Sequence, residues 1–78
     1  MDDLIITDSK LTELMHEAGV RPSVQRIAIL SFIANRKSHP TADNIYGNLA
    51  EKYPSLSRTT VYNSLRVLAD AGLVRELE

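Results

Sequence analysis

The sequence contains no cysteine and no tryptophan, and it has only three prolines and three glycines. Without cysteine, these residues hold no disulfide framework, no thiolate zinc site and no cysteine nucleophile, which fits a reducing compartment. No apolar run reaches the roughly 20 residues that a membrane-spanning helix needs, and the acidic start lacks the basic region of a signal peptide. We therefore expect a cytoplasmic protein that neither enters a membrane nor is secreted.

Groupings of side chains that carry catalysis are also missing. The sequence shows no Gly-rich phosphate loop, no paired metal-ligand motif, and no serine, histidine and acid in a plausible catalytic order. We therefore do not expect an enzyme. The chain does have 78 residues of ordinary apolar content (44% hydrophobic). That length suits one small, compact helical domain.

The net charge of −1 hides an uneven distribution of charge along the chain. Between residues 18 and 42, and again between residues 52 and 69, every charged side chain is basic: Arg21, Arg26, Arg36, Lys37, Lys52, Arg58 and Arg66. The acidic residues lie before, between and after these two segments. This separation predicts a fold with one basic and one acidic face, although an ordinary solvated surface could carry the same charges.

Apolar spacing and capping residues predict four helices. The first is capped by Asp8 or Ser9 and ends at Gly19, whose backbone tolerates a left-handed conformation. The others are expected at 23–35, 41–54 and 57–72, with Ser23, Thr41 and Ser57 as their caps. The second helix is so densely apolar, from Val24 through Ile29 and Leu30 to Ile33, that we expect it to be central.

The last six residues, LVRELE, alternate apolar and charged side chains as a half-buried strand does. Two helices joined by a short turn and followed by a strand outline a winged helix-turn-helix. The expected fold is mainly α, with four helices followed by a partial β-wing. Residues 1–78 would form one winged-helix domain of a longer protein, with residues 1–7 as a flexible end.

The predicted helix 57–72 has two different faces. On a helical wheel its apolar residues fall together and its polar residues fall opposite them: Val61, Leu65 and Leu68 against Thr59, Tyr62, Asn63 and Arg66. The polar groups are those that read base edges, and Ser57 and Arg58 lie at the helix start, where free N–H groups favour a phosphate. This face predicts contact with double-stranded DNA. Polar residues in water, around a tyrosine half packed on a neighbouring helix, would give the same wheel.

Three segments, in this order and at this spacing, resemble the N-terminal winged-helix domain of the Fur family of bacterial metal-dependent repressors: GVRPSVQRIAIL, HPTADNIYGNL and SRTTVYNSLRVLADAGLV. The resemblance runs from about Leu11 to the end. HPTADNIY and VYNSLRV look closer to the peroxide-sensing PerR branch than to the iron-sensing Fur branch, where an arginine commonly stands at the position of Asn63. The resemblance implies sequence-specific DNA binding by a repressor of metal homeostasis or peroxide stress genes.

The resemblance also implies particular DNA contacts. Tyr62 would lie against thymine in the major groove, and Arg21 would reach an adjacent, narrow A/T-rich minor groove. Arg58 departs from the small or apolar residue that usually follows the cap. The expected DNA-binding residues are Arg21, Ser57, Arg58, Thr59, Tyr62, Asn63 and Arg66.

His39 is the candidate metal ligand, because HPTAD resembles the family's regulatory site on the hinge side. Its fellow ligands would come from a C-terminal metal-binding dimerisation domain, so these 78 residues alone should hold no cofactor. For the full-length protein, the resemblance implies regulatory iron or manganese, structural zinc, and a homodimer on a palindromic A/T-rich operator. The alternative is a winged-helix module that binds protein and not DNA, which the neutral net charge would also suit.

Overall fold

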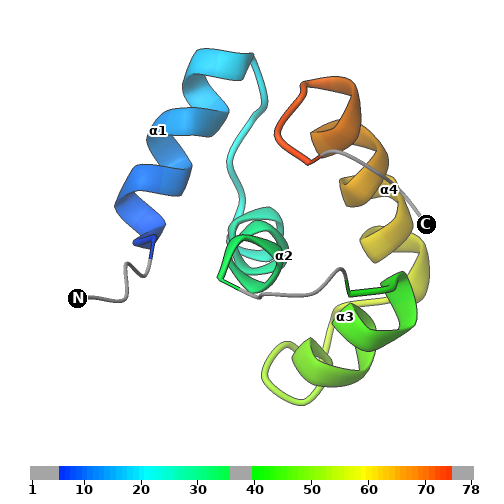
Figure 1. Cartoon of the computed structure of the whole chain (residues 1–78). Helices are drawn as coiled ribbons and strands as arrows, with labels where there is room; N and C mark the ends of the chain where they lie inside the picture. The colour runs from blue at the N-terminus through cyan, green and yellow to red at the C-terminus, as the bar shows by residue number, and fades with distance from the viewer. Residues whose placement is uncertain (1–5, 36–39, 75–78) are drawn as a thin grey trace.

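The computed structural model describes residues 6–35 and 40–74, which fold into four α-helices. The helices are α1 (Asp8–Ala18), α2 (Val24–Ala34), α3 (Ala42–Leu49) and α4 (Arg58–Asp70). In Figure 1, α2 is seen along its axis at the centre, with α1 on its left, α4 on its right and α3 at the lower right. Helix α2 contacts the other three, α3 also contacts α4, and α1 packs on α2 alone among the described helices. The expectation that the second helix is central is confirmed.

A hydroxyl side chain caps the start of each helix by accepting a hydrogen bond from the backbone N–H three residues further on. The caps are Thr7, Ser23, Thr41 and Ser57. Each such bond satisfies one of the N–H groups that a helix leaves unpaired at its start, so the predicted caps of the last three helices are confirmed. The predicted cap of the first helix is wrong. Thr7 takes that place, because its hydroxyl receives the N–H of Lys10, and Asp8 already lies in the first turn.

The helix ends follow the backbone preferences of glycine and proline. Gly19 ends α1 with a φ of 80°, in the left-handed region that a side chain would strain. Helix α3 ends at Leu49, earlier than predicted, and is followed by turns. Pro54 cannot donate a backbone hydrogen bond and disfavours the helical conformation of the residue before it. The chain therefore leaves α3 before it reaches this proline.

The segments before α1 and after α4 bear on two expectations, the flexible end and the wing strand. Ile6, placed by the sequence in a flexible end, exchanges two hydrogen bonds with the Asn35 side chain, at 2.9 and 3.3 Å. At the other end, Leu73 and Val74 form a bend, and residues 6–35 and 40–74 contain no strand. The rest of the expected wing strand, at 75–78, lies outside the described residues. Val74 is nevertheless buried, so the segment that follows α4 packs its side chain into the core.

The core lies between the four helices. Its most fully buried side chains are Leu11, Met15, Ile29, Ile45, Val61 and Leu68. The apolar stripe predicted for α4 is therefore confirmed. Val24, in contrast, is 67% exposed, because at 100° per residue it falls on the opposite side of α2 from Ile29 and Leu30.

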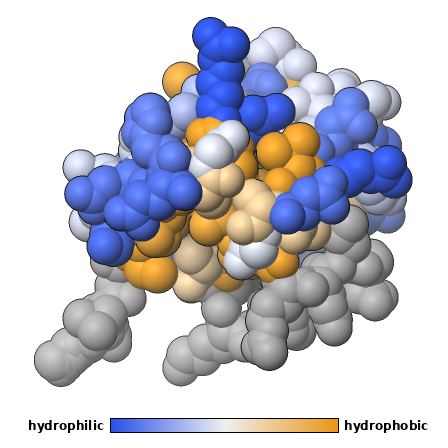
Figure 2. All heavy atoms as spheres, turned by 90° about the horizontal axis from the view of Figure 1, so that it is seen from above, coloured by the Kyte–Doolittle hydropathy of each residue, from blue (hydrophilic) through white to orange (hydrophobic). Residues whose placement is uncertain are grey.

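The core reaches the surface at the end of the molecule where α1 and α4 finish. Figure 2 looks down on this end and shows apolar side chains gathered between hydrophilic ones on either side. Half-buried apolar residues border the core cluster, among them Leu14 and Ala18 of α1 and Leu73 after α4. None of the described helices has the length and apolar character to cross a membrane.

Candidate nucleic-acid interface

Helix α4 presents a polar surface on the side away from the core. Thr59, Tyr62, Asn63 and Arg66 are all exposed. Tyr62 is 56% exposed and, with Val24, is one of two exposed large apolar residues in the described part of the chain. More than half of the surface of Tyr62 is therefore open to a partner outside the domain. The four side chains that the wheel grouped together therefore share one open face.

The start of α4 is positively polarised and well capped. The Ser57 hydroxyl accepts the Thr60 N–H at 3.1 Å and also lies 3.0 Å from the Thr60 hydroxyl. No acidic residue lies in the first turn of α4, so this turn does not neutralise the positive end of the helix dipole. The Ser57 hydroxyl is therefore engaged in the cap of α4.

Arg58 makes contacts within the domain that the sequence did not reveal. Its guanidinium donates to the carboxylate of Asp43 in α3 and lies 4.7 Å from the centre of the Tyr46 ring. The two charged side chains are 61% and 72% exposed, so water screens the pair, and such pairs contribute about 0–1 kcal/mol. A phosphate near the start of α4 would compete with Asp43 for Arg58.

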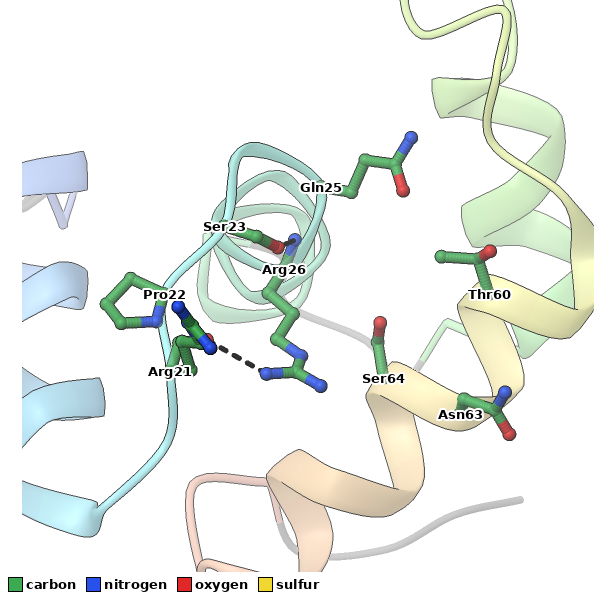
Figure 3. Close-up of a pocket in the computed structure, with 8 residues that line it drawn as sticks. All are labelled: Arg21, Pro22, Ser23, Gln25, Arg26, Thr60, Asn63 and Ser64. Atoms are coloured by element: carbon green, nitrogen blue, oxygen red, sulfur yellow. Dashed lines mark hydrogen bonds between the residues drawn. The ribbon is translucent and has the colours of Figure 1, made fainter.

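A hollow of about 360 Å³ lies between α4 and the start of α2. It is lined by Arg21, Pro22, Ser23, Gln25, Arg26, Thr60, Asn63 and Ser64. Figure 3 shows the Arg26 side chain extending from α2 into the space in front of α4, while the Asn63 amide points away on the far side of that helix. The lining includes two arginines and no acid, so the hollow is electropositive.

The structure thus brings most, but not all, of the predicted DNA-binding residues to one side. Arg21, in the loop before α2, lies across the hollow from Asn63, which also belongs to the outer face of α4. Arg58 is turned towards α3, as described above. His39 lies outside the described residues, and within 6–35 and 40–74 no three His, Cys, Asp or Glu side chains gather to hold a metal ion.

Sequence reasoning missed Arg26, Thr60 and Ser64 as lining residues of the hollow. A signal for Ser64 was available, because it borders the apolar stripe on the wheel of α4 and is in fact buried, with 5% of its surface exposed. Arg26 lies in the acid-free segment, but only the packing of α2 against α4 shows which way it points.

Comparison with known proteins identifies relatives of this chain. The peroxide operon regulator of Bacillus subtilis (strain 168) is 52% identical over 65 residues, covering 83% of this chain and 45% of the relative. The peroxide-responsive repressor PerR of Staphylococcus epidermidis (strain ATCC 12228 / FDA PCI 1200) is 49% identical over 63 residues, covering 81% of this chain and 42% of the relative. The chain therefore spans less than half the length of these two relatives.

A solved structure shows the same fold. PerR from Streptococcus pyogenes, described in terms of peroxide sensing and gene regulation, superposes with a TM-score of 0.79 at 39% identity, over 91% of this chain and 48% of that one. Residues 17–78 also match the sequence profile of the ferric uptake regulator family. This profile match and the relatives at about half identity confirm the resemblance found in the three segments, and the chain belongs to the ferric uptake regulator family.

Proposed function

We propose that this chain is the sequence-specific DNA-binding part of a PerR-like transcriptional repressor. The observation that carries the proposal is the outer face of α4, where Tyr62 is more than half exposed beside Asn63 and Arg66. In this role Tyr62 and Asn63 meet base edges in the major groove, and Arg66 meets the backbone. Arg21 extends the contact beyond α4 towards the adjacent minor groove. The function is binding, without catalysis.

The remaining DNA-binding residues act at the start of α4. Thr59 contacts a base or the backbone through its exposed hydroxyl. Ser57 orders the N–H groups of the first turn so that they face a phosphate, and Arg58 strengthens that contact once it leaves Asp43. The family membership and the two peroxide-responsive relatives support this assignment.

The whole regulator is proposed to be a homodimer on a palindromic A/T-rich operator. Residues 1–78 form its winged-helix domain, and the alternation in LVRELE supports a wing strand that starts after α4. Regulatory iron or manganese and structural zinc belong to the full-length protein. The described residues do not by themselves form a site that fits such a metal, and the DNA contacts proposed for this chain involve its own side chains alone.

A salt titration tests DNA binding against the rival, a winged helix that binds protein. The 78-residue chain is titrated onto duplex DNA at several salt concentrations, and the logarithm of the affinity is plotted against that of the salt concentration. Contacts to several phosphates should give a steep straight line, with a slope of about −0.9 for each phosphate neutralised. A shallow slope with every duplex tried would favour the rival.

His39 is proposed as a ligand of the regulatory metal. His39→Ala should leave DNA binding by the 78-residue chain unchanged, because its fellow ligands lie beyond these residues. In the full-length protein the same change should impair the response to metal. Loss of DNA binding by the 78-residue chain alone would place His39 in the DNA interface and remove it from the metal site.

A further inference from the structure

We infer that the hollow between α2 and α4 is the seat of a single backbone phosphate of the bound duplex, with Arg26 as its principal ligand. The inference rests on the proposed function and deepens it, because it assigns a contact to residues outside the outer face of α4. Three observations support it: the orientation of the Arg26 side chain, the absence of acidic residues from the lining, and the buried Ser64 hydroxyl, which has no partner among the described residues.

Arg26 is held in place by one side-chain hydrogen bond, and its other guanidinium N–H donors have no partner within residues 6–35 and 40–74. Its Nη1 atom donates to the carbonyl oxygen of Arg21 at 2.9 Å, which holds the guanidinium between the loop before α2 and helix α4 (Figure 3). Neither arginine has a carboxylate partner among the described residues. A guanidinium carries five N–H donors in a planar fork that matches the oxygens of a phosphate. The fork is therefore positioned in advance for an anion.

Ser64 supplies a second, independent observation. It is 5% exposed, and its hydroxyl has no hydrogen-bond partner within the described part of the chain. In Figure 3 this hydroxyl points into the space between α4 and Arg26. Buried polar groups in native proteins are almost always paired, so an unpaired one that lines a hollow indicates a ligand. A hydroxyl donates readily to a phosphate oxygen.

The hydrogen-bond donors that line the hollow favour an anion as its ligand. The position of the hollow beside the outer face of α4 indicates that this anion is a DNA phosphate. The hollow offers donors from Arg26, Ser64 and the start of α2, and its lining has no carboxylate that would repel an anion. Asn63 belongs both to the lining and to the outer face of α4, so a duplex lying along that face passes the mouth of the hollow. A phosphate bound here ties α2 to the duplex and so fixes the angle at which α4 enters the groove.

The test is a salt titration of the 78-residue chain and its variants on a random-sequence duplex, with thermal melts of every variant. Arg26→Gln should lower the slope by about 0.9, which is one phosphate contact. Arg26→Lys keeps the charge, although it cannot reproduce the fork, and should retain the slope. Lys10→Gln removes an equal charge from α1, where Lys10 pairs with Glu13, and should leave the slope unchanged.

A second variant covers the case in which Arg26→Gln does not fold. Ser64→Ala removes only an unpaired hydroxyl, so the melting temperature should be retained or raised. Affinity for the duplex should fall roughly tenfold, the scale of one hydrogen bond to a charged group. Ser9→Ala, an exposed serine of α1, is the matched control and should change neither quantity.

Two failures can be told apart. If the wild-type chain binds no duplex, the proposed function fails and this inference fails with it. If the wild-type chain binds with a steep slope, but Arg26→Gln folds and retains that slope or Ser64→Ala binds as tightly as Ser9→Ala, the proposed function stands and the phosphate seat is wrong.

Discussion

At the scale of single residues, Tyr62 carries the sharpest expectation, because it is more than half exposed and is not among the described residues that pack in or against the core. Tyr62→Ala should reduce the preference for a selected site over a scrambled duplex by roughly 1–3 kcal/mol, the scale of one base-pair contact. Binding to the scrambled duplex should change little, since phosphate contacts remain. The site is first selected from a randomised library with the wild-type chain. A drop in melting temperature with unchanged selectivity would instead make Tyr62 a packing residue.

Asp43 has a role that only the folded chain reveals. Because its carboxylate holds Arg58, Asp43→Asn should free that guanidinium, raise duplex affinity and steepen the salt slope by up to about one phosphate contact. Asp43 is also the acid in the first turn of α3, so unfolding free energy should fall by about 0.3–1 kcal/mol. Glu17→Gln, an equal change of charge in α1, is the control. Weaker DNA binding by Asp43→Asn would show that the pair orients Arg58 for the duplex.

At the scale of elements, α4 places its core residues and its proposed DNA-binding residues on two different faces. Leu68 is fully buried, so Leu68→Ala should cost about 2–5 kcal/mol of unfolding free energy, measured by urea denaturation. Thr59 lies on the exposed face, and Thr59→Ala should stay within about 0.5 kcal/mol of wild type. Equal losses from both changes would mean that the exposed face also packs against part of the protein.

Features that depend on residues close together in the sequence could be predicted, whereas features that depend on packing between helices could not. The starts of α2, α3 and α4 were predictable because a cap acts on a backbone N–H only three residues away. The two faces of α4 were predictable because periodicity alone separates them. The pairing of Asp43 with Arg58 was not, since it joins residues fifteen positions apart across two helices. The hollow likewise depends on how α2 packs on α4.

At the scale of the whole molecule, the proposed function gives one domain a single half-site contact. We expect the 78-residue chain to bind a palindromic site weakly, and two copies joined by a flexible linker to bind it about 10²–10⁴ times more tightly through effective concentration. The comparison uses duplexes with two half-sites about one helical turn apart, and duplexes with one half-site as controls. Equally tight binding by the single chain and the joined pair would contradict a dimeric operator.

The attachment of α1 has a consequence for partial unfolding. Among the described helices α1 packs on α2 alone, whereas α2, α3 and α4 contact one another. An element whose backbone comes close to one other helix opens at a lower free energy than a group of helices that all approach one another. In hydrogen exchange, the amides of Leu14 and Met15 should therefore lose protection before those of Ile29 and Leu68. Since Arg21 lies in the loop that joins α1 to α2, such opening would release one basic contact while the outer face of α4 stays intact.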